Sequence, residues 1–287
     1  MQDHLKGLVI TGLGVLCLVP DSLFVRLVEA DALAIAFWRG LVAGCLLALF
    51  VLVRMGARAF EDVLRAGWQG HAYILLYGLS APGFVLAVSL TSVANVVFIL
   101  ASMPVFAAVF SRLTLGEPIS ARMIWTMLGV FLGLAILIIG SKENAATSLA
   151  GDLVALGVSA CYAGALTAVR GVRARSMVPA APIALIGMSV LLLPFVDVLA
   201  PVAEFWPLLI AHGAFIAFAS GLMVLGPRYI GSAEVSLLIL LETVLAPLLV
   251  WAVIGEDPGV WALVGGGVVI AVLLLSNMVV LLRLRAI

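Results

Sequence analysis

Charged residues are scarce in this sequence, and no long polar stretch interrupts it. Only 10% of the residues are Asp, Glu, Lys or Arg, against about 25% in ordinary soluble domains. The 287 residues therefore leave no room for a soluble catalytic domain beside the apolar segments. Acidic and basic residues number 15 each, so the chain has no electrostatic basis for binding nucleic acid.

Cysteine and histidine are equally rare, with three residues of each. The cysteines lie singly inside apolar runs, without the spacing of a disulfide framework or a metal site, and we interpret them as small buried hydrophobic residues. The histidines are far apart, and none is paired with acids at ligand spacing. The phosphate-binding Gly-x-x-x-x-Gly-Lys-Ser/Thr loop is also missing. We expect no metal, no cofactor, no catalytic residues and no enzyme activity.

Apolar residues, in contrast, make up 65% of the chain. Short polar breaks divide them at intervals of about 25–30 residues, close to the length of a membrane span plus a turn. The N-terminus resembles a signal peptide but has no clean cleavage site, and we interpret it as a retained first helix. The pattern predicts an all-α integral membrane protein with ten transmembrane helices at residues 6–27, 32–53, 70–90, 93–112, 121–140, 150–170, 179–200, 205–225, 231–253 and 260–281.

Basic residues gather on one side of these predicted spans. If the N-terminus is inside, twelve of the fifteen Lys and Arg residues fall at the inner ends: Lys6, Arg54, Arg58, Arg65, Arg112, Arg122, Arg170, Arg173, Arg175, Arg228, Arg283 and Arg285. Arg26 and Lys142 lie on the outer side, and Arg39 lies within a span. This bias predicts that both termini are cytoplasmic.

Two segments of the chain are alike at a shift of 139 residues. Residues 94–117 and 233–256 share six identical positions of 24. Each follows a very short turn, ends in Gly-Glu and is the fourth helix of a group of five. Because five is odd, the second group must cross the membrane in the opposite sense, a common transporter construction. We predict inverted five-helix repeats at 1–145 and 146–287; a ten-helix protein that merely looks periodic is the alternative.

Several motifs, taken in order, point to one family. The chain resembles the drug/metabolite transporter superfamily, specifically its ten-helix, EamA-type metabolite exporters. The motifs that carry the resemblance are Phe37-Trp38-Arg39, the turn from Ser89 to Asn95, Pro104, Gly116-Glu117-Pro118, the segment from Arg228 to Glu234, and Gly255-Glu256. The seventh helix has no counterpart of Phe-Trp-Arg, so that motif belongs to the first half only.

The resemblance implies a secondary transporter of the bacterial-type inner membrane. It would export small metabolites, most commonly aromatic or other amphipathic amino acids, by alternating access through a central cavity between the repeats. Within the family, the resemblance suggests the aromatic amino-acid exporters of the YddG kind as a specific candidate group. Facilitative and proton-coupled transport both fit, as do a monomer and a homodimer. A membrane scaffold or assembly subunit without transport activity is the alternative function.

Glu242 is the ionisable residue that most needs an explanation. It lies near the middle of the predicted ninth helix, with no other charge nearby in sequence. A charge at this depth costs about 2.5–3.5 kcal/mol on insertion scales, so the residue should face the bundle interior. It can bind a substrate ammonium or carry a proton; a neutral carboxyl that joins helices by a hydrogen bond is the alternative.

Arg39 lies about two turns into the second predicted helix. Its guanidinium can hold a substrate carboxylate or pair with a carboxylate of the protein, Asp21 or Glu29, and we favour the ion pair. Trp38 beside it is expected either in the site or as an anchor at headgroup depth.

Aromatic and hydroxyl groups supply the remaining candidates. Tyr77 and Ser80 share one face of the third predicted helix, which suits an amphipathic solute but equally suits helix packing. Tyr162 lies at the middle of the sixth. His212, in the eighth, is either a proton carrier or a helix-to-helix hydrogen-bonding group.

Overall fold

The fold is helical throughout the described part of the chain, in which no strand occurs. A computed structural model describes residues 2–140, 148–172, 176–225, 229–230 and 232–285. In the first half of the chain the helices are α1 (Gln2–Leu18), α2 (Asp21–Leu27), α3 (Ala32–Met55), α4 (Arg58–Leu64), α5 (Gly67–Leu90), α6 (Val93–Leu100), α7 (Met103–Leu115) and α8 (Ala121–Gly140).

The second half continues in the same way, with a short 3-10 turn after its second helix. Its elements are α9 (Leu149–Gly171), α10 (Ala180–Leu192), η1 (Leu193–Phe195), α11 (Val202–Leu225), α12 (Ser232–Ile254) and α13 (Val260–Arg285). Each predicted span coincides with one helix or with two consecutive elements. The boundary predicted at residues 145 and 146 lies outside the described residues.

Two of the predicted spans are broken. The first is interrupted between α1 and α2, just before Asp21, where Pro20 cannot donate a backbone hydrogen bond. The fourth is interrupted at Ala101 and Ser102, so Pro104 lies in the first turn of α7 rather than inside a continuous helix. The short α4 was not anticipated from the sequence.

Most of these helices are long enough to span a membrane. Within the described residues, eight helical segments are long and apolar enough to cross a membrane. Two shorter apolar segments, Ala180–Phe195 and Leu238–Ile254, lie where the seventh and ninth spans are expected. The all-helical architecture with many apolar helices is confirmed, whereas ten spans in two repeats stay a prediction.

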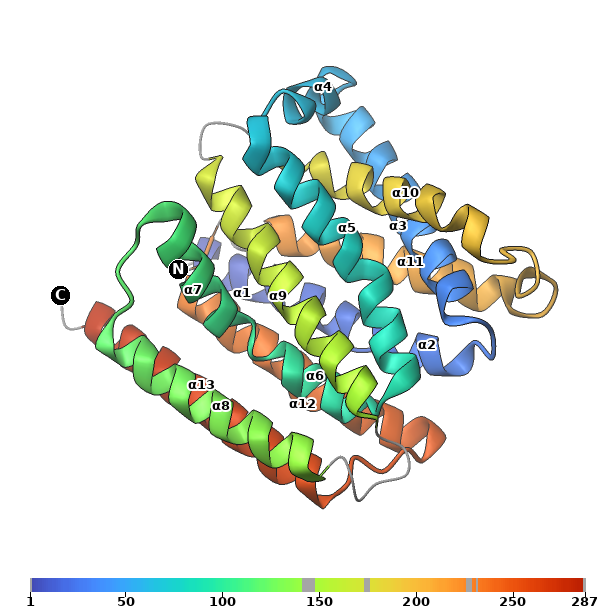
Figure 1. Cartoon of the computed structure of the whole chain (residues 1–287). Coiled ribbons are helices and arrows are strands. Elements are labelled where there is room, and N and C mark those ends of the chain that lie inside the picture. The colour runs from blue at the N-terminus through green and yellow to red at the C-terminus, as the bar shows by residue number, and fades with distance from the viewer. Residues whose placement is uncertain (1, 141–147, 173–175, 226–228, 231, 286–287) are drawn as a thin grey trace.

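The two halves of the chain interlock. The α3 helix packs against α10 and α11, α5 against α9, and α8 against α13 (Figure 1). The short α2 contacts α5, α11 and α12, so elements of both halves surround it. A side chain on α2 can therefore meet residues that are distant in sequence.

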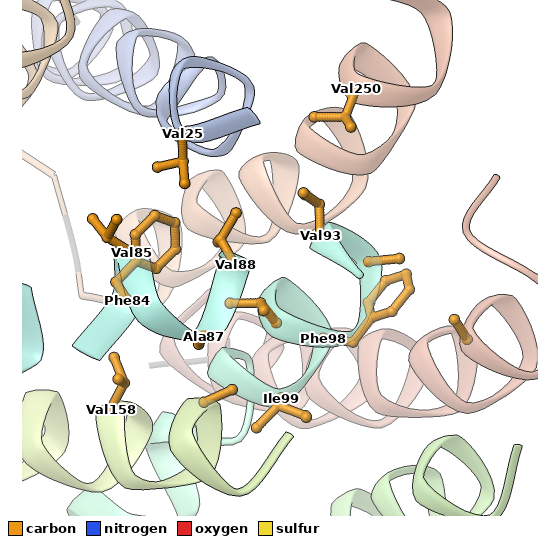
Figure 2. Close-up of a cluster of buried hydrophobic side chains, with 14 of the residues drawn as sticks. Val25, Phe84, Val85, Ala87, Val88, Val93, Phe98, Ile99, Val158 and Val250 are labelled. Carbon is orange, nitrogen blue, oxygen red and sulfur yellow. The ribbon is translucent and has the colours of Figure 1, made fainter. Parts of the chain in front are cut away.

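The largest apolar core joins both halves as well. Figure 2 shows Val25 of α2, Val88 of α5, Val93 of α6, Val158 of α9 and Val250 of α12 in one cluster. All five are at most 4% exposed. This cluster holds α2 in place from several sides.

Some residues behind the orientation prediction cannot be placed. Lys142, Arg173, Arg175 and Arg228 lie outside the described residues, as do the side chains of Arg283 and Arg285. Gly231 of the second-half motif also lies outside the described part.

Candidate functional site

Three ionisable side chains from three helices meet in the interior, and we call them the Asp21 cluster: Asp21, Arg39 and His212. Asp21 is the first residue of α2, and both of its carboxylate oxygens accept hydrogen bonds from Arg39 of α3. The distances are 2.9 Å from Nε to Oδ1 and 2.6 Å from Nη2 to Oδ2. This two-bond geometry is the strongest arrangement of an arginine with a carboxylate. The predicted ion pair of Arg39 therefore forms, with Asp21 as its partner.

His212 of α11 completes the cluster from the second half of the chain. Its Nε2 lies 2.5 Å from Asp21 Oδ1, and the side chain is 0% exposed. Phe24 stacks on the imidazole, with ring centres 5.2 Å apart. The second ring nitrogen, Nδ1, has no hydrogen-bond partner among the described residues. The predicted helix-to-helix hydrogen bond of His212 is thus present, with one polar atom left over.

Aromatic rings border Arg39. The guanidinium lies over the ring of Phe84, 5.4 Å from its centre. Tyr77 of α5 and Tyr162 of α9 lie in the neighbourhood of Arg39. The fold thus brings together three sequence candidates that lie on three different helices.

Glu242 lies close to the same cluster. It is half-buried in α12, and it interacts electrostatically with Asp21 and Arg39. Its position on the interior side agrees with the expectation from its depth in the helix. The cluster and Glu242 together combine two acids, one arginine and one histidine at the junction of the two halves.

The tyrosines form a short aromatic row beside the charges. Tyr73 and Tyr77 are stacked with ring centres 5.3 Å apart, and Tyr77 meets Tyr162 edge-on at 5.5 Å. Ser80, predicted on the same face, is 1% exposed and donates its hydroxyl hydrogen bond to the backbone carbonyl of Tyr77 at 2.7 Å. Ser80 therefore serves α5 locally, whereas the two tyrosines near Arg39 present aromatic surface.

Trp38 reaches the loop after η1. Its indole Nε1 donates a hydrogen bond to the carbonyl of Val198 at 2.7 Å, and its ring packs edge-on against Phe37. This contact agrees with an anchoring role better than with contact to a solute in the Asp21 cluster.

A second buried network lies at the α2–α3 end of the bundle, and we call it the Asp152 network: Arg26, Thr91, Asn95, Asp152 and Glu256. Asp152 Oδ1 accepts hydrogen bonds from Thr91 Oγ1 at 2.9 Å and from Asn95 Nδ2 at 3.0 Å.

Arg26 and Glu256 tie that network to α2 and to the turn after α12. Arg26 pairs with Glu256, with Nε 2.8 Å from Oε2, and donates to the carbonyl of Thr91 at 2.9 Å. Glu256 also accepts a hydrogen bond from the backbone nitrogen of Val93 at 2.7 Å. These contacts connect both halves of the chain at this end of the bundle.

The opposite end carries a more exposed pair. Arg170 of α9 donates to both carboxylate oxygens of Glu117, each at 2.8 Å, and Ser111 of α7 also donates to Glu117. Glu117 therefore caps the contact between α7 and α9 rather than the start of α8, which begins at Ala121.

A pocket of about 370 Å³ opens beside the α2–α3 turn rather than at the Asp21 cluster. Its lining includes four carboxylates, Glu29, Asp31, Asp197 and Glu204. Asp31 and Asp197 accept hydrogen bonds from backbone nitrogens at the starts of the following segments. The described residues contain no group of three His, Cys, Asp or Glu side chains that could hold a metal ion.

Sequence reasoning named Asp21 only as one of two partners for Arg39 and did not foresee its central place. A signal was available, because Asp21 is the one acidic residue within the apolar run from Gly7 to Val28. The Asp152 network gave a weaker signal: Thr91, Asn95 and Glu256 lie in motifs that carry the family resemblance, but polar residues are ordinary in turns and at helix ends.

One of three comparisons with known proteins gives the general class. The family model described as "EamA-like transporter family" matches residues 6–139 and 149–278. A solved structure described only as "Crystal structure of protein" is similar over 98% of both chains, with 18% identity and a TM-score of 0.65. At that identity the likeness concerns the fold alone. No curated protein matches the chain.

Proposed function

Because the chain belongs to the EamA-like transporter family, we propose that it is a secondary transporter that exports amino acids with aromatic or other amphipathic side chains. It works by alternating access through a central cavity between two inverted five-helix repeats, residues 1–145 and 146–287. The family assignment itself points to a multi-pass membrane protein that moves small solutes rather than to an enzyme.

The observation that carries this proposal is the Asp21 cluster. Asp21 and Arg39 come from the first half of the chain and His212 from the second, and all three are buried. Ionisable groups within membrane-spanning segments are costly, and they commonly mark substrate or ion pathways. A charged site at the junction of two halves is where a transporter built from repeats binds its substrate.

The chemistry around the cluster suits a zwitterion with an apolar side chain. Arg39 is a partner for a carboxylate, and Glu242 is a partner for an ammonium group. Tyr77 and Tyr162, in edge-on contact with each other and in the neighbourhood of Arg39, offer aromatic surface to the side chain. His212 and Glu242 also allow a proton to move with the solute.

Further support comes from the two consecutive stretches that the one family model matches, 6–139 and 149–278. They correspond to the two repeats inferred from the 139-residue shift. We place both termini in the cytoplasm of a bacterial-type cell, with the chain in its inner membrane, on the distribution of Lys and Arg.

Counterflow in proteoliposomes tests this function. Vesicles that contain the purified protein are loaded with one unlabelled amino acid at a time and exposed to its radiolabelled form. We expect saturable accumulation of L-phenylalanine, L-tyrosine or L-tryptophan. Absence of counterflow for every amino acid would reject the proposal and favour the alternative, a membrane scaffold or assembly subunit.

A further inference from the structure

We propose that Arg39 holds the carboxylate of the transported solute and that Asp21 is an internal competitor for the same edge of the guanidinium. The inference rests on the proposed function and deepens it, since it assigns one chemical group of the solute to one residue. It also makes Asp21 a residue that sets the affinity for the solute.

The geometry of the ion pair is the first argument. Asp21 uses both oxygens against the Nε and Nη2 edge of Arg39, at 2.9 and 2.6 Å. The carboxylate of an amino acid has the same planar pair of oxygens, and it fits the same edge with the same two hydrogen bonds. A solute that binds there must first replace Asp21.

The second argument is that little else of Arg39 is accessible. The residue is 9% exposed, and Phe84 lies over the face of the guanidinium at 5.4 Å. If Asp21 moves away, the Nε and Nη2 edge of Arg39 therefore becomes the surface at which a solute can bind.

Asp21 keeps a partner when it leaves Arg39. Its Oδ1 lies 2.5 Å from His212 Nε2, and the imidazole is held by stacking on Phe24. A buried carboxylate that lost every partner would be strongly destabilised. His212 can keep a hydrogen bond to Asp21 after the carboxylate has left Arg39. This explains why a third group lies beside an ion pair that already satisfies both partners.

Stability alone does not account for the pair. A buried ion pair is often no more stabilising than well-packed apolar side chains of similar volume. If Asp21 competes with the solute, in contrast, this position requires a carboxylate, because only a carboxylate forms the same two hydrogen bonds to Arg39 as the carboxylate of the solute.

The experiment compares binding of L-phenylalanine with binding of L-phenylalaninamide, which lacks the carboxylate. Half-saturating concentrations are measured by counterflow and by ligand-dependent changes in tryptophan fluorescence. Asp21→Asn removes the negative charge but keeps an acceptor for Arg39. We expect this variant to lower the half-saturating concentration of L-phenylalanine about tenfold, as loss of one charged competitor implies. The half-saturating concentration of L-phenylalaninamide should stay the same.

Asp152→Asn is the matched control. It is the same substitution at another buried aspartate, whose partners are Thr91 and Asn95 rather than Arg39. Any effect of this network on the opening of the protein changes both probes alike, so we expect Asp152→Asn to leave the ratio of the half-saturating concentrations of L-phenylalanine and its amide unchanged. An equal change of that ratio in both variants would overturn the competitor model.

A double variant guards against misfolding of Asp21→Asn. In Asp21→Asn combined with Arg39→Gln neither member of the ion pair is left without its partner, and we expect the preference for L-phenylalanine over its amide to disappear. The proposal is wrong if the preference survives, or if wild-type protein transports both probes equally well. The latter result would leave the proposed transport function intact, whereas lack of counterflow for every amino acid would reject both.

Discussion

Glu242 lies near the Asp21 cluster, so two acids, one arginine and one histidine occur together at the junction of the two halves. A neutral site requires one proton on His212, Glu242 or Asp21 in addition to the charge on Arg39. Burial favours such neutrality, because an uncompensated charge at this depth is costly. At the scale of single residues, such a site suits the exchange of a proton or a charged solute that we propose.

Glu242→Gln tests the contribution of the carboxylate in α12. Glutamine has nearly the same shape but can neither release a proton nor bind an ammonium ion as an anion. We expect counterflow of L-phenylalanine to be lost, or to persist without any dependence on pH. Flux is measured in proteoliposomes at acidic and alkaline pH.

Glu61→Gln is the control for this substitution, since Glu61 lies on α4 in an exposed pair with Arg65. It should transport as wild type does. Glu242 has no part in the mechanism if its glutamine variant keeps both the flux and the pH profile of the wild-type protein.

At the scale of elements, the helices are joined by close packing and by two polar contacts at opposite ends. The α8 and α13 helices approach so closely that a side chain does not fit between them. A Cβ atom at Gly265 would lie 2.6 Å from the backbone oxygen of Gly133. Small residues at such crossings allow membrane helices to pack by direct backbone contact.

A pair of neighbouring glycines tests this packing. Gly265→Ala forces α13 away from α8, and we expect a loss of about 1–3 kcal/mol, as for other overpacked contacts. Gly267→Ala is the matched control in the same helix, because no atom beyond its chain neighbours and the nearby backbone of α13 lies within 4 Å of its added Cβ. Thermal unfolding in detergent compares them; equal midpoints would show that the crossing tolerates a methyl group.

The Asp152 network joins several helices at the α2–α3 end of the bundle. Glu256→Gln weakens the pair with Arg26, whose atoms lie 2.8 Å apart. If this end opens during transport, the change should raise the population of the open form about fivefold, the equivalent of about 1 kcal/mol.

A cysteine at Ser92, in protein whose natural cysteines are replaced by alanine, reports this opening. Ser92 is 0% exposed at the start of α6, so maleimide labelling in detergent requires movement. We expect faster labelling with Glu256→Gln and no change with Glu61→Gln. Identical labelling rates in all three proteins would argue that the network does not act as a gate.

At the scale of the whole molecule, the proposed inverted repeats require an odd number of spans in each half. The two halves then cross the membrane in opposite senses while both termini lie on the same side. Positive charge at the inner ends is the usual determinant of such an orientation.

Reporter fusions test this topology. Green fluorescent protein after Ile287 should fluoresce, because it folds in the cytoplasm, and alkaline phosphatase at the same place should be inactive. Alkaline phosphatase after residue 144, between the proposed repeats, should be active. An active phosphatase at the C-terminus would contradict the even number of spans.

The sequence by itself located the long apolar helices and the residues that needed an explanation, but not the short α4 or the breaks after α1 and α6. A helix in lipid satisfies its own backbone hydrogen bonds, so composition and length along the chain suffice to locate it. The same reasoning singled out Arg39 and Glu242, because a charge inside an apolar run is visible without any structure.

Only the tertiary structure decided which of these groups meet. His212 and Asp21 are 191 positions apart, and their contact depends on how α2 and α11 are rotated and packed. Likewise, Glu256 reaches Val93 across 163 positions. Side-chain pairing between helices is set by packing angles and rotations that no local pattern encodes, which is why the central role of Asp21 emerged from the fold.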